Sequence, residues 1–496
     1  MLTVKPYTFW FVAGSQPLYG EETLRGVADH SKEIVAGLNQ QGHLPFEVVF
    51  KEVVTTSTNI HDLVQAANTD ENCAGIITWM HTFSPAKNWI AGLKALQKPL
   101  LHFHTQYNRD IPWDSIDMDF MNLNQSAHGD REYGFMVTRM DIPRKVIVGH
   151  WQSEDVTNKL ADWMQTAIAV AEGRQIRVAR FGDNMRHVAV TDGDKIEAQM
   201  KFGWTVDYYG IGDLVEEMDK VTEQELADLY AEYEQLYDLP AEASEPGAVR
   251  DSILYQGRIE LGLKSFLEKG NYTAFTTNFE DLHGMKQLPG LAAQRLMAEG
   301  YGFAGEGDWR TAALTRLMKI MANNQRTSFM EDYTYHLEPD NEMILGSHML
   351  EVCPTVSATK PRIEVHPLGI GGKEDPARLV FDGDGGDAVN ASLVEMGGRY
   401  RLIINEVKAE QPEKETPNLP VAKVLWKPQP NLSEATEAWI YAGGAHHTVF
   451  SLEVSTEQLY DFADMTDIEC VIIDEDLQLR QFRNELKWND LFYRNR

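Results

Sequence analysis

The sequence predicts an α/β protein in which two units with parallel sheets precede a β-rich unit with an antiparallel sheet or barrel. Through the first half of the chain, short apolar runs alternate with amphipathic stretches, and this alternation is typical of parallel sheets covered by helices. After about residue 326, alternating strands with tight Gly-rich turns replace that pattern, as in antiparallel sheets and barrels. The length of 496 residues corresponds to about three domains.

The first unit is expected to span residues 1–175. Its apolar runs predict strands at 7–12, 46–51, 75–78, 100–104 and 145–149. Its amphipathic runs predict helices at 21–40, 60–67, 86–96 and 155–171, with a long loop after residue 104. In such a sheet the functional crevice lies beyond the C-terminal ends of the strands. The side chains at or just past those ends are Gln16, Tyr19, His81, Phe83, His104, Gln106 and Asn108.

His102 and His104 lie two positions apart on a predicted strand and therefore share one face. Two histidines on one face could chelate a metal, but no carboxylate accompanies them in the local sequence. We therefore expect His104 to line the crevice rather than to bind a metal.

The second unit is expected to span residues 176–325 and the third residues 326–496. In the second unit we predict strands at 176–181, 203–209 and 272–277, and helices at 223–237 and 250–269 and from residues 291 and 309. In the third unit we predict strands at 362–367, 377–381, 391–396, 400–406 and 422–428.

Composition excludes several classes of protein. A formal charge of −30 argues against nucleic-acid partners, which require a basic footprint. No apolar stretch approaches the roughly 20 residues that span a bilayer, so no membrane partner is expected. The three cysteines are scattered and form no CxxC pair, which disfavours a disulfide framework or a thiolate zinc site and favours the cytoplasm.

Two carboxylates and two histidines stand among glycines, aromatics or aliphatics rather than on charged stretches: Glu306, Glu331, His348 and His447. A buried carboxylate is costly unless a cation or hydrogen bonds compensate it, and two Glu with two His suit one divalent ion. Taken singly, each residue also has an ordinary explanation. Glu306 could be an acid at a helix start, Glu331 a solvated loop acid, and His348 a satisfied core residue.

His446 and His447 are neighbours, and adjacent side chains on a strand point to opposite faces. Both could approach one ion only if the backbone is irregular, which the preceding Gly443, Gly444 and Ala445 would allow. The local sequence does not decide between them.

Five stretches of the chain resemble the L-arabinose isomerase family. Three surround the residues just described: Ala-Gly-Glu-Gly-Asp-Trp-Arg at 304–310, Ser-Phe-Met-Glu-Asp-Tyr-Thr-Tyr-His at 328–336 and Gly-Gly-Ala-His-His-Thr-Val-Phe-Ser at 443–451. The other two are Phe-Trp-Phe-Val-Ala-Gly-Ser-Gln-Pro-Leu-Tyr-Gly at 9–20 and Gln-Ser-Ala-His-Gly-Asp-Arg-Glu-Tyr-Gly at 125–134. The resemblance therefore covers nearly the whole chain.

This resemblance implies two Rossmann-like domains followed by a β-rich, barrel-like C-terminal domain. It implies metal-dependent isomerisation of L-arabinose to L-ribulose, and use of D-galactose to give D-tagatose, through an enediol or enediolate. It makes Glu306, Glu331, His348 and His447 metal ligands and the two glutamates the proton-transfer pair. The ligand set favours Mn²⁺, with Co²⁺ or Mg²⁺ as substitutes.

The family resemblance also implies contacts with the sugar from a larger set: Gln16, Leu18, Tyr19, Gln125, His128, Met185, Phe279, Ile370 and His446. It implies a homo-oligomer, a hexamer or a tetramer, with active sites completed at subunit interfaces. Two alternatives remain. One is a related ketol isomerase acting on another sugar such as L-fucose, and the other is a non-catalytic sugar-binding protein on the same scaffold.

Overall fold

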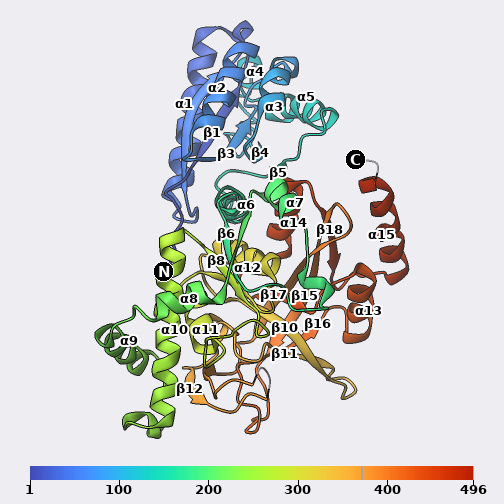
Figure 1. The fold of residues 1–496 in the computed structure, drawn as a ribbon. Helices are drawn as coiled ribbons and strands as arrows, with labels where there is room; N and C mark the ends of the chain where they lie inside the picture. The colour runs from blue at the N-terminus through green and yellow to red at the C-terminus, as the bar shows by residue number, and fades with distance from the viewer. Residues whose placement is uncertain (370–371, 495–496) are drawn as a thin grey trace. The chain divides into compact units, whose positions relative to one another are not determined.

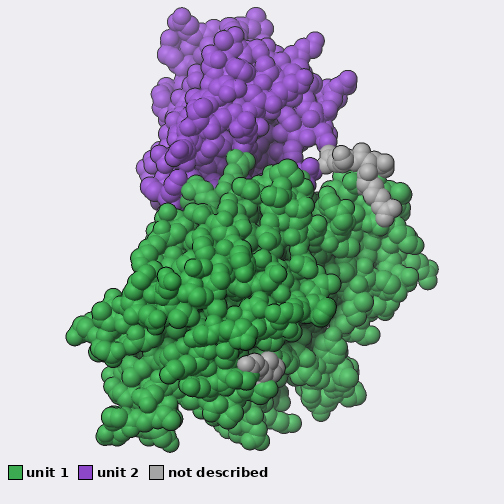
Figure 2. Space-filling view, viewed as in Figure 1, with its two compact units in different colours: residues 1–3, 172–463, 468–496 green, residues 4–171, 464–467 purple. Residues whose placement is uncertain are grey.

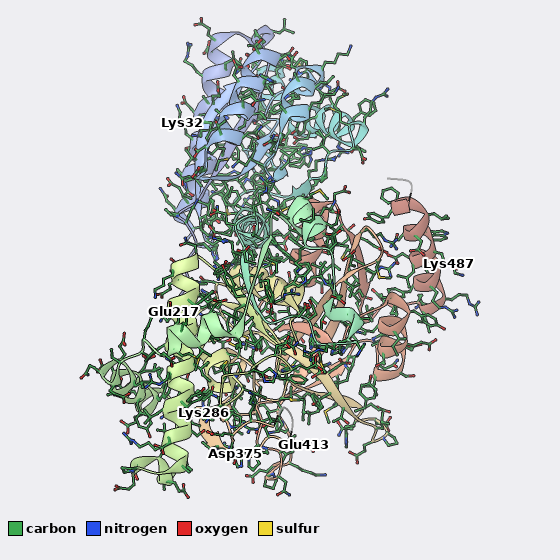
Figure 3. All side chains as sticks on the ribbon, viewed as in Figure 1. Lys32, Glu217, Lys286, Asp375, Glu413 and Lys487 are labelled. Carbon is green, nitrogen blue, oxygen red and sulfur yellow. The ribbon has the colours of Figure 1, made fainter. Side chains whose placement is uncertain are left out.

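The computed structural model describes residues 1–369 and 372–494. The chain forms two compact units, coloured separately in Figure 2. Unit 1 comprises residues 1–3, 172–463 and 468–496, and unit 2 comprises residues 4–171 and 464–467. Charged side chains such as Lys32, Glu413 and Lys487 are exposed and project from the ribbon (Figure 3).

Unit 2 is built on a five-stranded parallel sheet in the order β2-β1-β3-β4-β5. Its strands are β1 Thr8–Gly14, β2 Glu47–Val54, β3 Cys73–Trp79, β4 Leu100–His104 and β5 Lys145–Val148. The helices between them are α1 Gly20–Gln40, α2 Ser57–Thr69 and α3 Ile90–Ala95, and α6 Glu154–Gly173 follows β5 (Figure 1). Every residue of β3 is buried, as expected for a central strand covered on both faces.

The long loop predicted after residue 104 is wrong, because part of it is helical. Two helices occupy it, α4 Met118–Leu123 and α5 Ser126–Arg139. Within α5, Asp130 is buried and its two carboxylate oxygens lie 2.7 Å from His102 Nε2 and 2.6 Å from His104 Nδ1. The carboxylate that the local sequence lacked therefore comes from a helix almost 30 residues away and orients both rings.

Acidification is expected to lower the free energy of unfolding of unit 2 through His81, which is fully buried just after β3. Burial is the main cause that lowers the pKa of His81 from 6.5 to about 3, and the charge of the neighbouring His30 adds to it. The unfolded chain takes up a proton as the pH falls below about 6.5, whereas the native His81 does not until about 3, so stability is lost across this window. The free energy of unfolding can be measured with urea at about pH 7 and about pH 5. Between these two pH values the wild-type protein should lose on the order of 2 kcal/mol more unfolding free energy than His81→Gln does. Equal losses in the two proteins would contradict this assignment.

Unit 1 contains a second parallel sheet, in the order β7-β6-β8-β9. Its strands are β6 Arg177–Phe181, β7 Thr205–Tyr209, β8 Ala274–Thr277 and β9 Gly302–Ala304. The accompanying helices are α7 Lys195–Phe202, α8 Ile211–Met218, α9 Glu223–Leu236, α10 Ala248–Gly270, α11 Gly290–Ala298 and α12 Trp309–Met321. Three of these elements, α7, α8 and β9, are short and were not among the predicted ones.

Unit 1 also contains a closed antiparallel barrel of six strands in the order β14-β17-β10-β11-β16-β15, closed by pairing of β14 with β15. The barrel strands are β10 Thr327–His336, β11 Met343–Ser347, β14 Gly386–Glu395, β15 Tyr400–Glu410, β16 Val424–Pro428 and β17 His447–Ser451. A seventh strand, β18 Glu469–Ile473, extends β15 in parallel. The helices α13 Leu432–Ala442, α14 Thr456–Thr466 and α15 Leu479–Arg494 complete this part of the chain. The predicted fold class, with parallel sheets followed by an antiparallel barrel, is confirmed.

Two predicted strands of the third unit lie outside the barrel. β12 Arg362–Val365 and β13 Ala377–Val380 pair with each other in a separate two-stranded sheet, and Arg362 also forms an isolated parallel bridge with Asp238. Their alternation resembles that of barrel strands, so the sequence pattern did not separate them.

The helix α12 is shared by the parallel sheet and the barrel. Every residue from Trp309 to Met321 is buried, and the helix contacts β6, β8 and β9 as well as β10, β14 and β17. The proposed division at 175/176 and 325/326 stays a prediction. Over the described ranges, no helix has both the length and the apolar character needed to cross a bilayer.

Candidate metal centre and active site

Glu306 lies in the turn between β9 and α12 and has an unusual backbone. Its φ of 62° is in the left-handed region, which is rare for a residue with a side chain and is often found at functional sites. Hydrogen bonds hold the turn, because Glu306 O accepts from Met185 N at 2.9 Å and Gly307 N donates to Thr277 O at 3.1 Å. Gly307 also needs its small size, since a Cβ there would lie 2.6 Å from Asp183 O. The predicted glycine-rich turn is thus a strained and firmly anchored one.

The strands of the barrel bring Glu331 and both predicted histidine ligands to the same place. Glu331 on β10 lies directly opposite His447 on β17 and opposite Ser347 on β11, the residue before His348. The rings of His348 and His447 have centroids 5.7 Å apart, and Phe329 contacts both. Glu331 therefore lies in a strand rather than in a solvated loop.

Glu306 faces the two adjacent histidines. Its carboxylate lies 3.8 Å from Nε2 of His446 and 3.8 Å from Nε2 of His447. His447 begins β17 and His446 precedes it, so the strict alternation of a strand does not apply to the pair. The donor atoms of Glu306, His446 and His447 all lie within 4.8 Å of one another. The backbone irregularity considered from the sequence is therefore present.

The electrostatic field of the site favours a cation. Burial raises the pKa of Glu306, but the neighbouring imidazole of His446 and the charges of His447 and His348 outweigh it and hold the pKa below its usual value. Burial disfavours the charged form of His348, yet Glu351, Glu331 and Glu306 together raise its pKa to about 9. A site that holds a proton on a buried imidazole this firmly has excess negative charge, which a divalent ion would neutralise in place of the proton.

Two buried carboxylates that the sequence did not single out fix the ring orientations of the histidines. Asp308 Oδ2 lies 3.0 Å from His447 Nδ1, and Glu351 Oε2 lies 2.8 Å from His348 Nδ1. Such contacts set the tautomer and leave Nε2 as the ligand atom in many metal sites. The available signal was proximity in sequence, because Asp308 lies two residues after Glu306 and Glu351 three residues after His348.

The described residues fit a divalent metal ion. Nε2 of His447 is buried and has no hydrogen-bond partner within the described ranges, which is costly for a polar atom unless a ligand binds it. Carboxylate oxygens and imidazole nitrogens are donors that Mn²⁺ and related ions accept.

Among the predicted sugar contacts in unit 1, Met185 and Phe279 lie in the loops that follow β6 and β8. Asn278 Nδ2 donates to Asp183 O at 3.0 Å and connects the two loops. The backbone N–H of Met185 donates a hydrogen bond to the backbone carbonyl of Glu306. Both side chains are partly exposed. Ile370 lies outside the described residues.

The predicted sugar contacts in unit 2 gather beyond the C-terminal end of β1. Gln125 lies 3.2 Å from the Tyr19 hydroxyl through Nε2 and 3.1 Å from His128 Nδ1 through Oε1. Gln16 precedes Tyr19 by one short turn, in which Leu18 is 83% exposed. These residues thus lie near one another, and their role as sugar contacts stays a prediction.

Comparison with known proteins gives matches over almost the whole chain. Three family models match in succession: the L-arabinose isomerase N-terminal domain over residues 3–175, the central domain over 177–324 and the C-terminal domain over 326–469. The L-arabinose isomerase of Geobacillus stearothermophilus is 67% identical over 496 residues, which is 100% of both chains. That of Bacillus subtilis is 63% identical over 494 residues, 100% of this chain and 99% of the relative. That of Clostridium beijerinckii is 63% identical over 489 residues, 99% of each chain.

Proposed function

The chain belongs to the L-arabinose isomerase family, and from this premise we propose that it converts L-arabinose to L-ribulose. D-galactose is the proposed second substrate, which would give D-tagatose. The observation that carries the proposal within the structure is the anchored Glu306 turn, which places a carboxylate against His446 and His447. Aldose–ketose isomerisation needs a group that moves a proton between C1 and C2, and this arrangement supplies one.

The proposed metal ligands are Glu306, Glu331, His348 and His447, and the proposed ion is Mn²⁺, with Co²⁺ or Mg²⁺ as substitutes. A divalent cation held there supplies positive charge that stabilises the negative charge developing on the substrate oxygens. Asp308 and Glu351 act on the ligands rather than on the substrate, because each accepts from the Nδ1 of one histidine.

The proposed acid–base pair is Glu306 and Glu331. One carboxylate removes the proton from C2 of the open-chain sugar, which gives an enediol or enediolate, and a carboxylic acid returns a proton at C1 or assists at oxygen. His446 is the proposed sugar contact beside Glu306, from which it is 3.8 Å distant. Met185, Phe279 and Ile370 are proposed to line the sugar from the loops of unit 1.

We further propose that the protein is a cytoplasmic homo-oligomer, a hexamer or a tetramer. Gln16, Leu18, Tyr19, Gln125 and His128 would then contact the sugar held by a neighbouring subunit. Leu18 is 83% exposed, so its side chain is accessible to a neighbouring subunit. Dilution to monomers should abolish turnover if the sites are shared.

Ketose formation is expected only when a divalent metal is present. Full-length protein stripped with EDTA should form no L-ribulose from L-arabinose, and added Mn²⁺ should restore it. Undiminished turnover after complete removal of metal would contradict the assignment of the metal centre. No product with or without metal, from L-arabinose, D-galactose or L-fucose, would instead favour a sugar-binding protein.

A further inference from the structure

The interior of the barrel contains a cavity of about 240 Å³. Three cross-strand pairs, which together draw on all six barrel strands, lie around it: Met330–Thr448, Ile344–Trp426 and Asn390–Asn405. Of these six residues all but Met330 line the cavity, and α13 closes one side of it with Ala435 and Trp439. Tyr335 and Ile440 also line it and are 45% and 70% exposed, so the cavity opens to solvent.

Two residues on the wall of this cavity, both largely buried, have hydrogen-bond donors without an acceptor among the described residues. Asn390 is 4% exposed, and its Oδ1 accepts from Thr448 Oγ1 at 3.2 Å. Within residues 1–369 and 372–494, no group accepts from its Nδ2 or from the indole Nε1 of Trp426, which is 2% exposed. Donors that face a cavity are satisfied by water or by a ligand. Two such donors on the wall of one open cavity suit a molecule that offers several acceptors.

The remaining wall defines the chemistry of that molecule. Trp426, Trp439 and Tyr335 supply aromatic surface, and Asp332 supplies a carboxylate that can accept from hydroxyl groups. No lysine or arginine is among the described residues that line the cavity, which disfavours an anion. Aromatic faces combined with amide, hydroxyl and carboxylate groups are suited to a neutral polyhydroxylated molecule.

We propose that this barrel cavity is a second binding site, separate from the metal centre, for a neutral polyol of monosaccharide size. Its separation follows from the strands, because successive side chains alternate between faces. Glu331 and His447 point to the metal centre, whereas their neighbours Asp332 and Thr448 line the cavity. His446 reaches both, since it lines the cavity and lies 3.8 Å from Glu306. Occupancy of the cavity is thereby coupled to the position of His446.

The test is the number of L-arabinitol molecules bound per protomer, measured by equilibrium dialysis of the full chain with and without Mn²⁺. This polyol has no carbonyl group to isomerise. We expect one metal-independent molecule in EDTA, with a change in tryptophan fluorescence, and a second molecule when Mn²⁺ is added. Absence of metal-independent binding would overturn the proposal of a second site, even if isomerase activity is found. Metal-independent binding without isomerase activity would refute the proposed function and leave the second site standing.

Two variants locate the metal-independent site. Asn390→Leu removes the free amide and fills space in the cavity. Thr436 is half-buried on α13, and Thr436→Phe places a ring in the mouth of the cavity without altering a barrel strand. Each variant should weaken metal-independent binding of L-arabinitol at least about ten-fold. Each should leave the Mn²⁺-dependent binding of the second molecule unchanged. Glu437→Phe puts the same ring on the exposed side of α13 and should change neither. Unchanged metal-independent binding in a folded Thr436→Phe protein would overturn the proposal.

Discussion

Glu306→Gln is expected to lower L-ribulose formation by at least about 100-fold while the protein remains folded, because positioned acids and bases contribute roughly 10²–10⁴-fold. Glutamine keeps the size of the side chain and leaves the backbone anchors to Met185 and Thr277 in place. It removes the charge that the pKa shift of Glu306 shows to be favoured by the surrounding histidines. The measurement is kcat with saturating L-arabinose and Mn²⁺.

The matched control for this variant is Glu338→Gln, which makes the same chemical change at a glutamate with 61% side-chain exposure that contacts the nearby His336 and Asn341. It should retain wild-type turnover. Residual activity above about 1% in Glu306→Gln would show that this carboxylate is not an essential acid, base or ligand. Glu331→Gln is expected to behave like Glu306→Gln.

Asp308→Asn is expected to weaken Mn²⁺ binding by about 10–100-fold, as do other changes to groups that orient metal ligands. Asp308 accepts from Thr311 N at 3.0 Å, from Thr311 Oγ1 at 2.7 Å and from His447 Nδ1 at 3.0 Å. Asparagine has only one acceptor oxygen, so its NH₂ must face one of these donors. If it faces His447, the ring takes the other tautomer and Nε2 loses the lone pair that would bind a metal.

Equilibrium dialysis with Mn²⁺ measures the affinity directly, and activity should recover in part at high Mn²⁺. Asp308 also caps α12, so loss of the cap must be distinguished from loss of the histidine contact. Asp194→Asn makes the same change at the cap of α7, where the carboxylate accepts from Ile196 N and Glu197 N. It should leave the affinity unchanged. Wild-type affinity in Asp308→Asn would show that the carboxylate does not set the state of His447.

Sequence periodicity predicted the strands better than it predicted the helices at the crevice. The strand predicted at 100–104 coincides with β4, because a short apolar run bounded by polar residues is a local signal. The helix α5 was missed since its buried face consists of Ser126, Gly129, Asp130, Tyr133 and Val137. Such a face has no apolar stripe, and its glycines lower the helix propensity. Helices that bury polar groups are therefore the ones that hydrophobic periodicity overlooks.

The candidate site could be predicted from the sequence only in part. Glu306, Glu331, His348 and His447 were singled out by their surroundings and by the family motifs, although their roles remain predictions. The contact of Asp308 with His447 spans 139 positions and depends on α12 meeting β17. No local pattern encodes a meeting of that kind. The free amide of Asn390 is equally invisible in sequence, because it follows from closure of the barrel.

The complete burial of α12 between the parallel sheet and the barrel limits how this chain can be recombined. A crossover at residue 325/326 would join α12 from one parent to β10, β14 and β17 from another, and its apolar and charged side chains would then meet surfaces that evolved against a different helix. Chimaeras that exchange residues 172–463 as one block keep both of its surfaces matched. Modularity in this protein is therefore coarser than the number of its sheets.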